Sequence, residues 1–223
     1  MGELQALRKV AHKLTLKKTE DILTDVAQYY SEKLVLHGET PQGVDWNGEE
    51  SQTLRFEQLY KIVKTTNHFS INDIGCGYGA LYDFLTHKHE SFSYSGIDVS
   101  ESMIHAAEQR YKNKSQARFV ASSEPDQVAD YGVASGIFNV RLNRTDEEWR
   151  TYLEATLDLL DRTSSKGFAF NCLTSYSDTD KMRDYLYYAD PCVLFDLCKR
   201  KYSRNVSLLH DYGLYEFTIL VRK

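Results

Sequence analysis

Three glycines within five residues follow a short apolar run and precede a segment of helical period. These are Gly75, Gly77 and Gly79. Because glycine has no Cβ, a chain with this spacing can turn tightly and bring its backbone close to a ligand. A glycine-rich turn that binds nothing has the same pattern, so the segment predicts a strand, a tight turn and a helix. Ligand binding needs a second feature to support it.

Short apolar runs alternate with amphipathic segments from residue 67 onward, which is typical of βαβ units and a mostly parallel sheet. The apolar runs at residues 206–209 and 217–221 flank a turn-like segment and are expected to pair antiparallel. We expect the other strands near residues 69–74, 94–99, 117–120, 133–138 and 167–172.

Apolar residues at helical spacing predict an N-terminal helix over residues 19–36, and Leu54, Leu59, Ile62 and Val63 predict a second helix. We therefore expect a helical cap or lid over residues 1–66 and one α/β domain over residues 67–223, together forming one compact unit. Residues 175–202 are expected to form two short helices.

A formal net charge of −5 in 223 residues disfavours a general phosphate-binding surface, so nucleic acid is not the expected partner. The four cysteines form no CxxC pair, and no cleavable apolar stretch follows Met1. No apolar run approaches the length needed to span a bilayer. These observations predict a cytoplasmic protein without a membrane partner, and they leave the oligomeric state open.

A carboxylate supplies the second feature that the glycine turn needs. The strand expected at residues 94–99 carries Asp98 near its tip, where a carboxylate can accept both ribose hydroxyls of an adenosine ligand. Asp73, Gly75, Gly77 and Gly79 form an acidic residue followed by GxGxG, whereas the dehydrogenase pattern GxGxxG does not fit. From about residue 69 to the C-terminus, the chain resembles the class I S-adenosylmethionine-dependent methyltransferases.

That resemblance implies a Rossmann-like α/β fold with a seven-stranded, mostly parallel sheet, helices on both faces, a C-terminal antiparallel hairpin and an N-terminal helical cap. It also implies S-adenosyl-L-methionine as cofactor and S-adenosyl-L-homocysteine as product. Ser123 stands where the family often has an acidic residue at the adenine. The cofactor-binding positions that the resemblance suggests are Arg55, Asp73, Gly75, Cys76, Gly77, Gly79, Asp98, Val99, Met103, Ser122, Ser123 and Gly136.

The residues that handle the acceptor follow less directly from the sequence. Asn139, at the expected tip of the fourth strand, is a candidate to hold an acceptor hydroxyl, and a turn asparagine is the competing interpretation. If a hydroxyl is methylated, His210, Asp211 or His37 is a candidate base. Clustered tyrosines, among them Tyr185, are expected to line an acceptor pocket, although helix packing explains them equally well.

No histidine, cysteine and carboxylate spacing indicates a metal site, and neither GxSxG nor a P-loop is present. The sequence therefore favours an S-adenosylmethionine-dependent methyltransferase of a small-molecule acceptor, with oxygen slightly favoured over nitrogen. Two alternatives remain: a methyltransferase of tRNA or protein, and a cofactor-binding sensor or interaction protein without turnover.

Overall fold

The structure, a computed structural model, describes residues 21–223. A helix over residues 21–37 comes first. The first twenty residues of the expected cap lie outside the described part of the chain. The elements that follow are η1 (Pro41–Val44), α2 (Glu49–Tyr60), β1 (Phe69–Ile74), α3 (Ala80–Thr86), β2 (Phe92–Asp98), α4 (Glu101–Tyr111), β3 (Ala117–Ala121), β4 (Ala129–Ala134), α5 (Asp146–Arg162), β5 (Ser164–Thr174), η2 (Thr179–Lys181), β6 (Tyr188–Ala189), α6 (Pro191–Lys201), β7 (Asn205–Leu209) and β8 (Glu216–Arg222).

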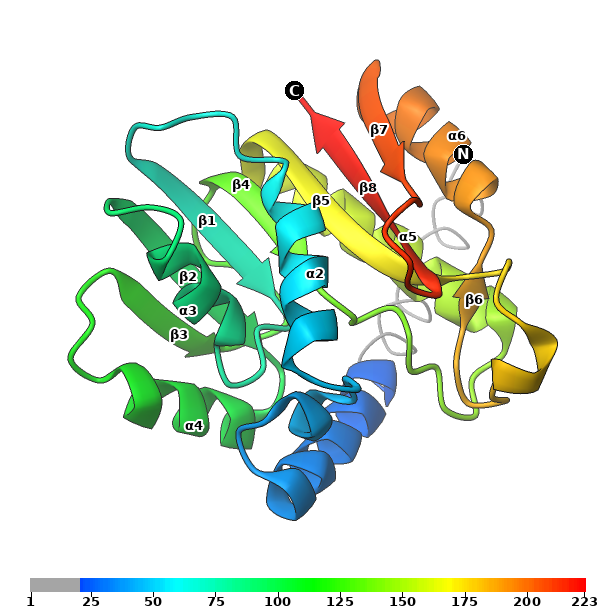
Figure 1. Cartoon of the computed structure of the whole chain (residues 1–223), viewed down its shortest axis with the longest axis horizontal. Coiled ribbons are helices and arrows are strands. Elements are labelled where there is room, and N and C mark those ends of the chain that lie inside the picture. Colours follow the sequence, from blue (N-terminus) through cyan, green and yellow to red (C-terminus); the bar gives the residue numbers. More distant parts are fainter. Residues whose placement is uncertain (1–20) are drawn as a thin grey trace, which may run out of the picture.

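The strands form one sheet in the order β3-β2-β1-β4-β5-β8-β7, with the two-residue strand β6 beside β5. Strands β1 to β5 run parallel, whereas β8 is antiparallel to both β5 and β7. This confirms the expected fold, including the C-terminal hairpin. From β1 the next strands, β2 and β3, are added on one side of the sheet, and from β4 the next strand, β5, is added on the other side. The carboxyl ends of β1 and β4 therefore border the crevice where open α/β sheets bind ligands (Figure 1).

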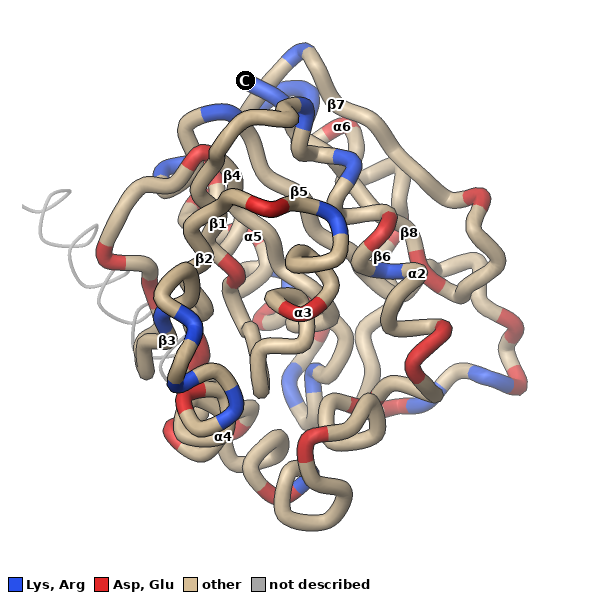
Figure 2. Tube along the Cα trace, turned by 60° about the vertical axis from the view of Figure 1, so that its left-hand side comes forward, with Lys and Arg blue, Asp and Glu red and all other residues tan. Residues whose placement is uncertain are grey.

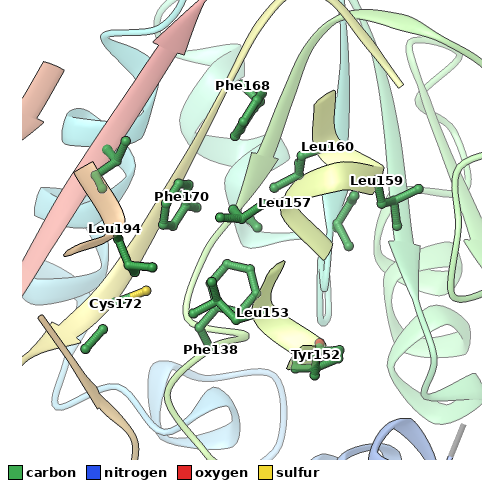
Figure 3. Packing of buried hydrophobic residues seen from close by; sticks show 14 of the residues in the cluster. Phe138, Tyr152, Leu153, Leu157, Leu159, Leu160, Phe168, Phe170, Cys172 and Leu194 are labelled. Atoms are coloured by element: carbon green, nitrogen blue, oxygen red, sulfur yellow. The ribbon is translucent and has the colours of Figure 1, made fainter. Parts of the chain in front are cut away.

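Apolar side chains cover both faces of the sheet. Phe168 and Phe170 of β5 point toward α5, while Ala169 between them joins the cluster formed by α2 and α3. Helix α5 buries Leu153 and Leu157 in the same cluster as Phe168 and Phe170 (Figure 3). A central strand buried on both sides fixes the position of its neighbours, including the tips that surround the crevice.

The fourth strand ends earlier than the sequence predicts. Apolar residues suggested a strand over residues 133–138, but β4 ends at Ala134. Gly136 has a left-handed φ of 77°, and its N–H donates to Asn171 Oδ1 at 2.8 Å, so the chain leaves the sheet there. Phe138 is nevertheless fully buried, because α5 covers it and Trp149 Nε1 donates to its carbonyl.

Of the two short helices expected in residues 175–202, the second forms as α6, with Asp190 Oδ1 accepting from the N–H groups of Cys192 and Val193. The first is reduced to the three-residue 3-10 helix η2. The rest of this segment is extended, because β6 pairs with the end of β5 and Tyr187 N–H donates to the carbonyl of Asn139. In the described part of the chain, none of the helices combines the length and hydropathy that crossing a bilayer requires.

The start of α5 provides a test of local stability. Thr145 Oγ1 accepts from Glu148 N–H, and the Glu148 carboxylate accepts from Thr145 N–H. We expect Thr145→Ala to lower the free energy of unfolding by about 1 kcal/mol in urea denaturation, because the N–H of Glu148 loses the side-chain oxygen that accepts from it. The control is Thr151→Ala in the middle of the same exposed face, which should have no effect or stabilise slightly. Equal losses in both variants would contradict the capping interpretation.

Candidate active site

A cavity of about 510 Å³ opens at the carboxyl ends of β1, β2 and β4, and we call it the first cavity. Its size is in the range of pockets that hold a cofactor. It brings together most of the positions expected from the sequence. These are Asp73, Gly75, Cys76, Gly77, Asp98, Val99, Met103, Ser122, Ser123 and Gly136.

The glycine turn forms one wall of this cavity. Gly75 and Gly77 have left-handed φ angles of 74° and 54°. A Cβ on Gly75 would lie 2.1 Å from Ile137 Cγ2, so the packing as well as the backbone requires glycine. Gly79 has a φ of 83° but does not line the cavity, since its α-carbon packs against Tyr111 and Phe119. Gly79 is instead the N-cap residue of α3.

Asp98 ties the glycine turn to the tip of β2. Its Oδ2 accepts from Gly77 N–H and its Oδ1 from Ser100 N–H, both at 2.9 Å. Burial raises the pKa of this carboxyl above its ordinary value, while the backbone hydrogen bonds act in the opposite direction. Each oxygen keeps acceptor capacity toward the cavity, which suits two neighbouring hydroxyl groups of a ribose.

Asp73 lies deeper in the wall and is 2% exposed. Its Oδ2 accepts from the Tyr94 hydroxyl at 2.6 Å, whereas its Oδ1 is buried without a partner among the described residues. Burial raises the pKa of Asp73 to about 7, more than the Tyr94 hydrogen bond lowers it. A buried carboxylate oxygen without a partner is costly, and a cationic ligand group in the cavity would offset that cost.

The side of the cavity where the resemblance suggested the adenine contains a carboxylate that was not among the expected positions. Ser123 occupies the expected position, but Glu124 beside it also lines the cavity and forms an ion pair with Arg162 at 2.7 Å. Ser122 N–H donates to the carbonyl of Asp98, which fixes this turn beside the tip of β2. This acidic side chain lies one position beyond the one that the resemblance suggested, and sequence spacing alone did not indicate that it faces the cavity.

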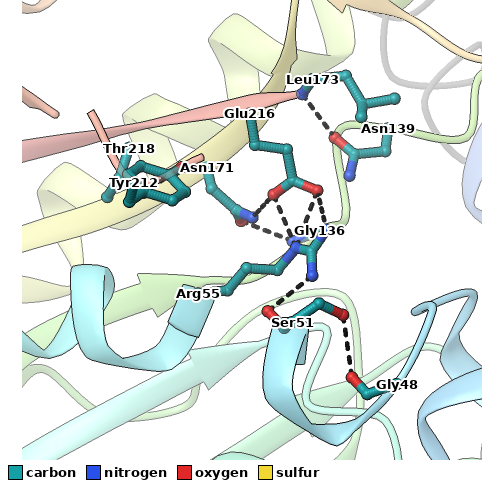
Figure 4. A network of polar contacts seen from close by, with 10 residues as sticks. All are labelled: Gly48, Ser51, Arg55, Gly136, Asn139, Asn171, Leu173, Tyr212, Glu216 and Thr218. Carbon is teal, nitrogen blue, oxygen red and sulfur yellow. Dashed lines mark hydrogen bonds and ion pairs between the residues drawn. The ribbon is translucent and has the colours of Figure 1, made fainter. Parts of the chain in front are cut away.

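Arg55 lies away from the first cavity. Its Nε and Nη2 donate to the carboxylate of Glu216 at 2.6 to 2.9 Å, and its Nη1 donates to the carbonyl of Ser51 (Figure 4). The guanidinium also lies 3.9 Å from the centre of the Trp46 ring. The guanidinium that the resemblance suggested for cofactor binding is therefore occupied by Glu216, a residue 161 positions away.

A second cavity of about 570 Å³ adjoins the first. The two share Tyr30, Val44, Trp46 and Gly136 in their walls. A Cβ on Gly136 would lie 2.4 Å from the Trp46 ring, so this contact forms the boundary between them. The remaining residues of its wall are Lys33, His37, Gln42, Asp45, Asn47, Arg55, Asn139, Val140, Leu173, Ser177, Lys181, Arg183, Tyr185, Leu186, Tyr188, Tyr215 and Glu216.

Only some of the candidate catalytic residues line a cavity. Asn139 lines the second cavity, with its Oδ1 accepting from Leu173 N–H at 3.1 Å. His37 also lines it, on the exposed rim. His210 and Asp211 line neither cavity, and the exposed ring of His210 packs against Tyr176 and Phe217 instead. Among residues 21–223, no group of three or more histidine, cysteine or acidic side chains is arranged to hold a metal ion.

Comparisons with known proteins agree with this geometry. A family model described as a methyltransferase domain matches residues 72–163. Rv1506c of Mycobacterium tuberculosis (strain ATCC 25618 / H37Rv), which is named as a methyltransferase, is 61% identical over 163 residues, covering 73% of this chain and 98% of that protein. This chain belongs to the class I S-adenosylmethionine-dependent methyltransferases.

Two further proteins are similar to this methyltransferase. A malonyl-[acyl-carrier protein] O-methyltransferase of Paenibacillus sp. (strain JDR-2) is 26% identical over 97 residues, 44% of this chain and 35% of that protein. The N-methyltransferase NodS of Bradyrhizobium japonicum WM9, solved with S-adenosylhomocysteine, superposes with a TM-score of 0.61. Its identity is 17%, over 88% of this chain and 97% of NodS, so this likeness concerns the fold.

The first cavity fits the cofactor of this methyltransferase family. S-adenosylmethionine carries a sulfonium and an ammonium, and the cavity presents three acidic side chains, Asp73, Asp98 and Glu124, against one basic side chain, Arg162. The buried Asp73 oxygen without a partner is an acceptor for such a cation. The glycine turn leaves the space that a Cβ would fill.

Substitution of Asp98 tests its assignment to the ribose. We expect Asp98→Asn to weaken S-adenosylhomocysteine binding about 10- to 100-fold in calorimetric titration, because hydrogen bonds to a charged acceptor are lost. The matched control is Asp126→Asn, an exposed aspartate that forms an ion pair with Arg118 outside the cavity. An affinity within threefold of the wild type for Asp98→Asn would contradict the assignment.

The pKa of Asp73 predicts a pH dependence of cofactor binding. A cationic ligand group favours the charged carboxylate, so affinity for S-adenosylmethionine should fall as pH drops through about 7, where Asp73 becomes protonated. Titrations between pH 5.5 and 7.5 should show this fall, with at most about a tenfold loss for each pH unit. Asp98 and Tyr94 lie beside the group, so Asp73→Asn is used to isolate its contribution. An unchanged slope in Asp73→Asn would refute the prediction.

Proposed function

We propose that this methyltransferase acts on a small-molecule acceptor that binds in the second cavity, and that oxygen rather than nitrogen is the methylated atom. The observation that supports this best is the shared wall of the two cavities at Gly136 and Trp46. A methyl donor in the first cavity and an acceptor in the second would lie on either side of this wall. A volume of about 570 Å³ suits a small molecule.

When bound, the cofactor supplies an electrophilic methyl group, and the task of the protein is to hold the acceptor in line with it. Tyr30, Val44 and Trp46 form an apolar side of the boundary that limits access of water. Asn139, fixed through its Oδ1, keeps its amide NH2 group for an acceptor atom. In this proposal these residues orient the acceptor, and the positions grouped around Asp98 hold the cofactor.

The charges of the second cavity favour oxygen. A cationic amine would need a carboxylate free to receive it, but Asp45 forms an ion pair with Lys33 and Glu216 with Arg55. The name of the Paenibacillus relative, an O-methyltransferase, points in the same direction. NodS is named an N-methyltransferase, but at 17% identity it carries no argument about the acceptor.

A nucleic-acid acceptor finds less support. Along the described chain, lysine and arginine residues alternate with aspartate and glutamate residues rather than gathering on one face (Figure 2). A sensor without turnover would have no need of the second cavity beside the cofactor site.

A transfer experiment separates these alternatives. The protein is incubated with methyl-labelled S-adenosylmethionine and with separated small-molecule, RNA and protein fractions of a bacterial extract. We expect label in the small-molecule fraction, and its loss with the Asp98→Asn variant. Label in RNA or protein would identify a macromolecular acceptor, and cofactor binding without transfer to any fraction would support the sensor.

A further inference from the structure

The two cavities carry opposite charge. Acidic side chains predominate in the first cavity, and basic side chains predominate in the second, although the whole chain has a net charge of −5. This distribution of charge suits a cationic methyl donor in the first cavity and an anionic acceptor in the second. The charged groups of the second cavity are Lys33, Arg55, Lys181 and Arg183 against Asp45 and Glu216. Lys181 also forms an ion pair with Asp180, which is not part of the wall.

Both carboxylates of the second cavity already have strong partners. Asp45 accepts from the Tyr29 hydroxyl at 2.5 Å and lies 2.6 Å from the Lys33 ammonium. Glu216 is 1% exposed and accepts from Arg55 and from the amide of Asn171 (Figure 4). Removing a proton from a bound acceptor would require one of these carboxylates to give up an ion pair.

The other titratable groups do not supply a base inside the cavity. Burial holds the pKa of the Tyr30 hydroxyl well above its ordinary value, so it keeps its proton. The Tyr215 hydroxyl donates to Asp178, and the Tyr188 hydroxyl accepts from the N–H of Arg183. Tyr185 is exposed. His37 lies on the exposed rim. Within the described part of the cavity wall, an acceptor that must lose a proton therefore finds no free interior base.

Donor groups, in contrast, are available. Asn139 keeps its amide NH2 group because only its Oδ1 is engaged, by Leu173 N–H. Arg183 donates through Nη1 to the carbonyls of Asp180 and Met182 and forms no ion pair with a described carboxylate. Its guanidinium keeps a further donor edge, which matches the two oxygens of a carboxylate.

We propose that the acceptor is a carboxylic acid and that the product is its methyl ester, an inference that rests on the function proposed above. A carboxylate oxygen bonds to the methyl carbon, the carbon–sulfur bond breaks, and sulfur keeps the electron pair. No proton moves, so no base is needed. An anion and a sulfonium become two neutral groups, and the apolar boundary of Tyr30, Val44 and Trp46 favours such a loss of charge because it holds little water.

Trp46 offers a binding test that does not require the natural acceptor. The chain has two tryptophans, so Trp149→Phe leaves Trp46, on the wall of the second cavity, as the reporter. This protein, saturated with S-adenosylhomocysteine, is titrated with benzoate, benzamide, octanoate and octanamide. We expect a saturable fluorescence change for at least one carboxylate, with at least fivefold weaker binding of its amide. Arg183→Gln should weaken carboxylate binding about tenfold, whereas the control Arg200→Gln, on exposed α6, should not.

The chemistry is tested with tritiated methyl groups and a panel of carboxylic acids, alcohols, phenols and amines. Methyl esters release volatile methanol in alkali, whereas ethers and methylamines keep their label. Alkali-labile product supports the proposal. Alkali-stable product, equal binding of carboxylates and amides, or no saturable carboxylate binding overturns it. Binding of S-adenosylhomocysteine that depends on Asp98 is measured alongside, so that a failure of the cofactor site is distinguished from a failure of this inference.

Discussion

The carboxylate of Asp98 joins the parts on which the first cavity depends. It accepts from Gly77 in the turn after β1 and from Ser100 at the start of α4. Two segments that follow different strands, β1 and β2, thus share one acceptor beside the crevice at the carboxyl ends of the strands. The turn keeps its left-handed glycines, and the tip of β2 keeps a carboxylate that faces the cavity. We propose that cofactor binding uses the same carboxylate that holds the loop in place.

A second buried network connects the cap to the sheet. The Glu216 carboxylate of β8 accepts from Arg55 of α2 and from the amide NH2 group of Asn171 of β5. The amide oxygen of Asn171 accepts in turn from the N–H of Gly136 (Figure 4). Burying an ion pair carries a desolvation cost, and removing one partner leaves an uncompensated charge that typically costs about 3 to 5 kcal/mol. The network therefore fixes α2 and Trp46 relative to the turn that separates the two cavities.

Local patterns predicted those features that depend on neighbouring residues. The glycine turn and the Asp98 carboxylate each follow from a few positions in the sequence. Arg55 could not be placed, because its partner Glu216 is distant in the chain. The end of β4 was missed because burial of Phe138 by α5 has the same apolar pattern as burial in a strand. His210 follows a strand as a catalytic residue often does, but the hairpin directs it away from both cavities.

The central claim is that the first cavity holds the cofactor through Asp98 and the glycine turn, with its reactive end toward the second cavity. A crystal structure of the complex with S-adenosylhomocysteine tests it most directly. We predict ribose hydroxyls within hydrogen-bond distance of the Asp98 carboxylate and the thioether sulfur on the side of Gly136 and Trp46. Adenosine bound in the second cavity, or a ribose without contact to Asp98, would contradict the account.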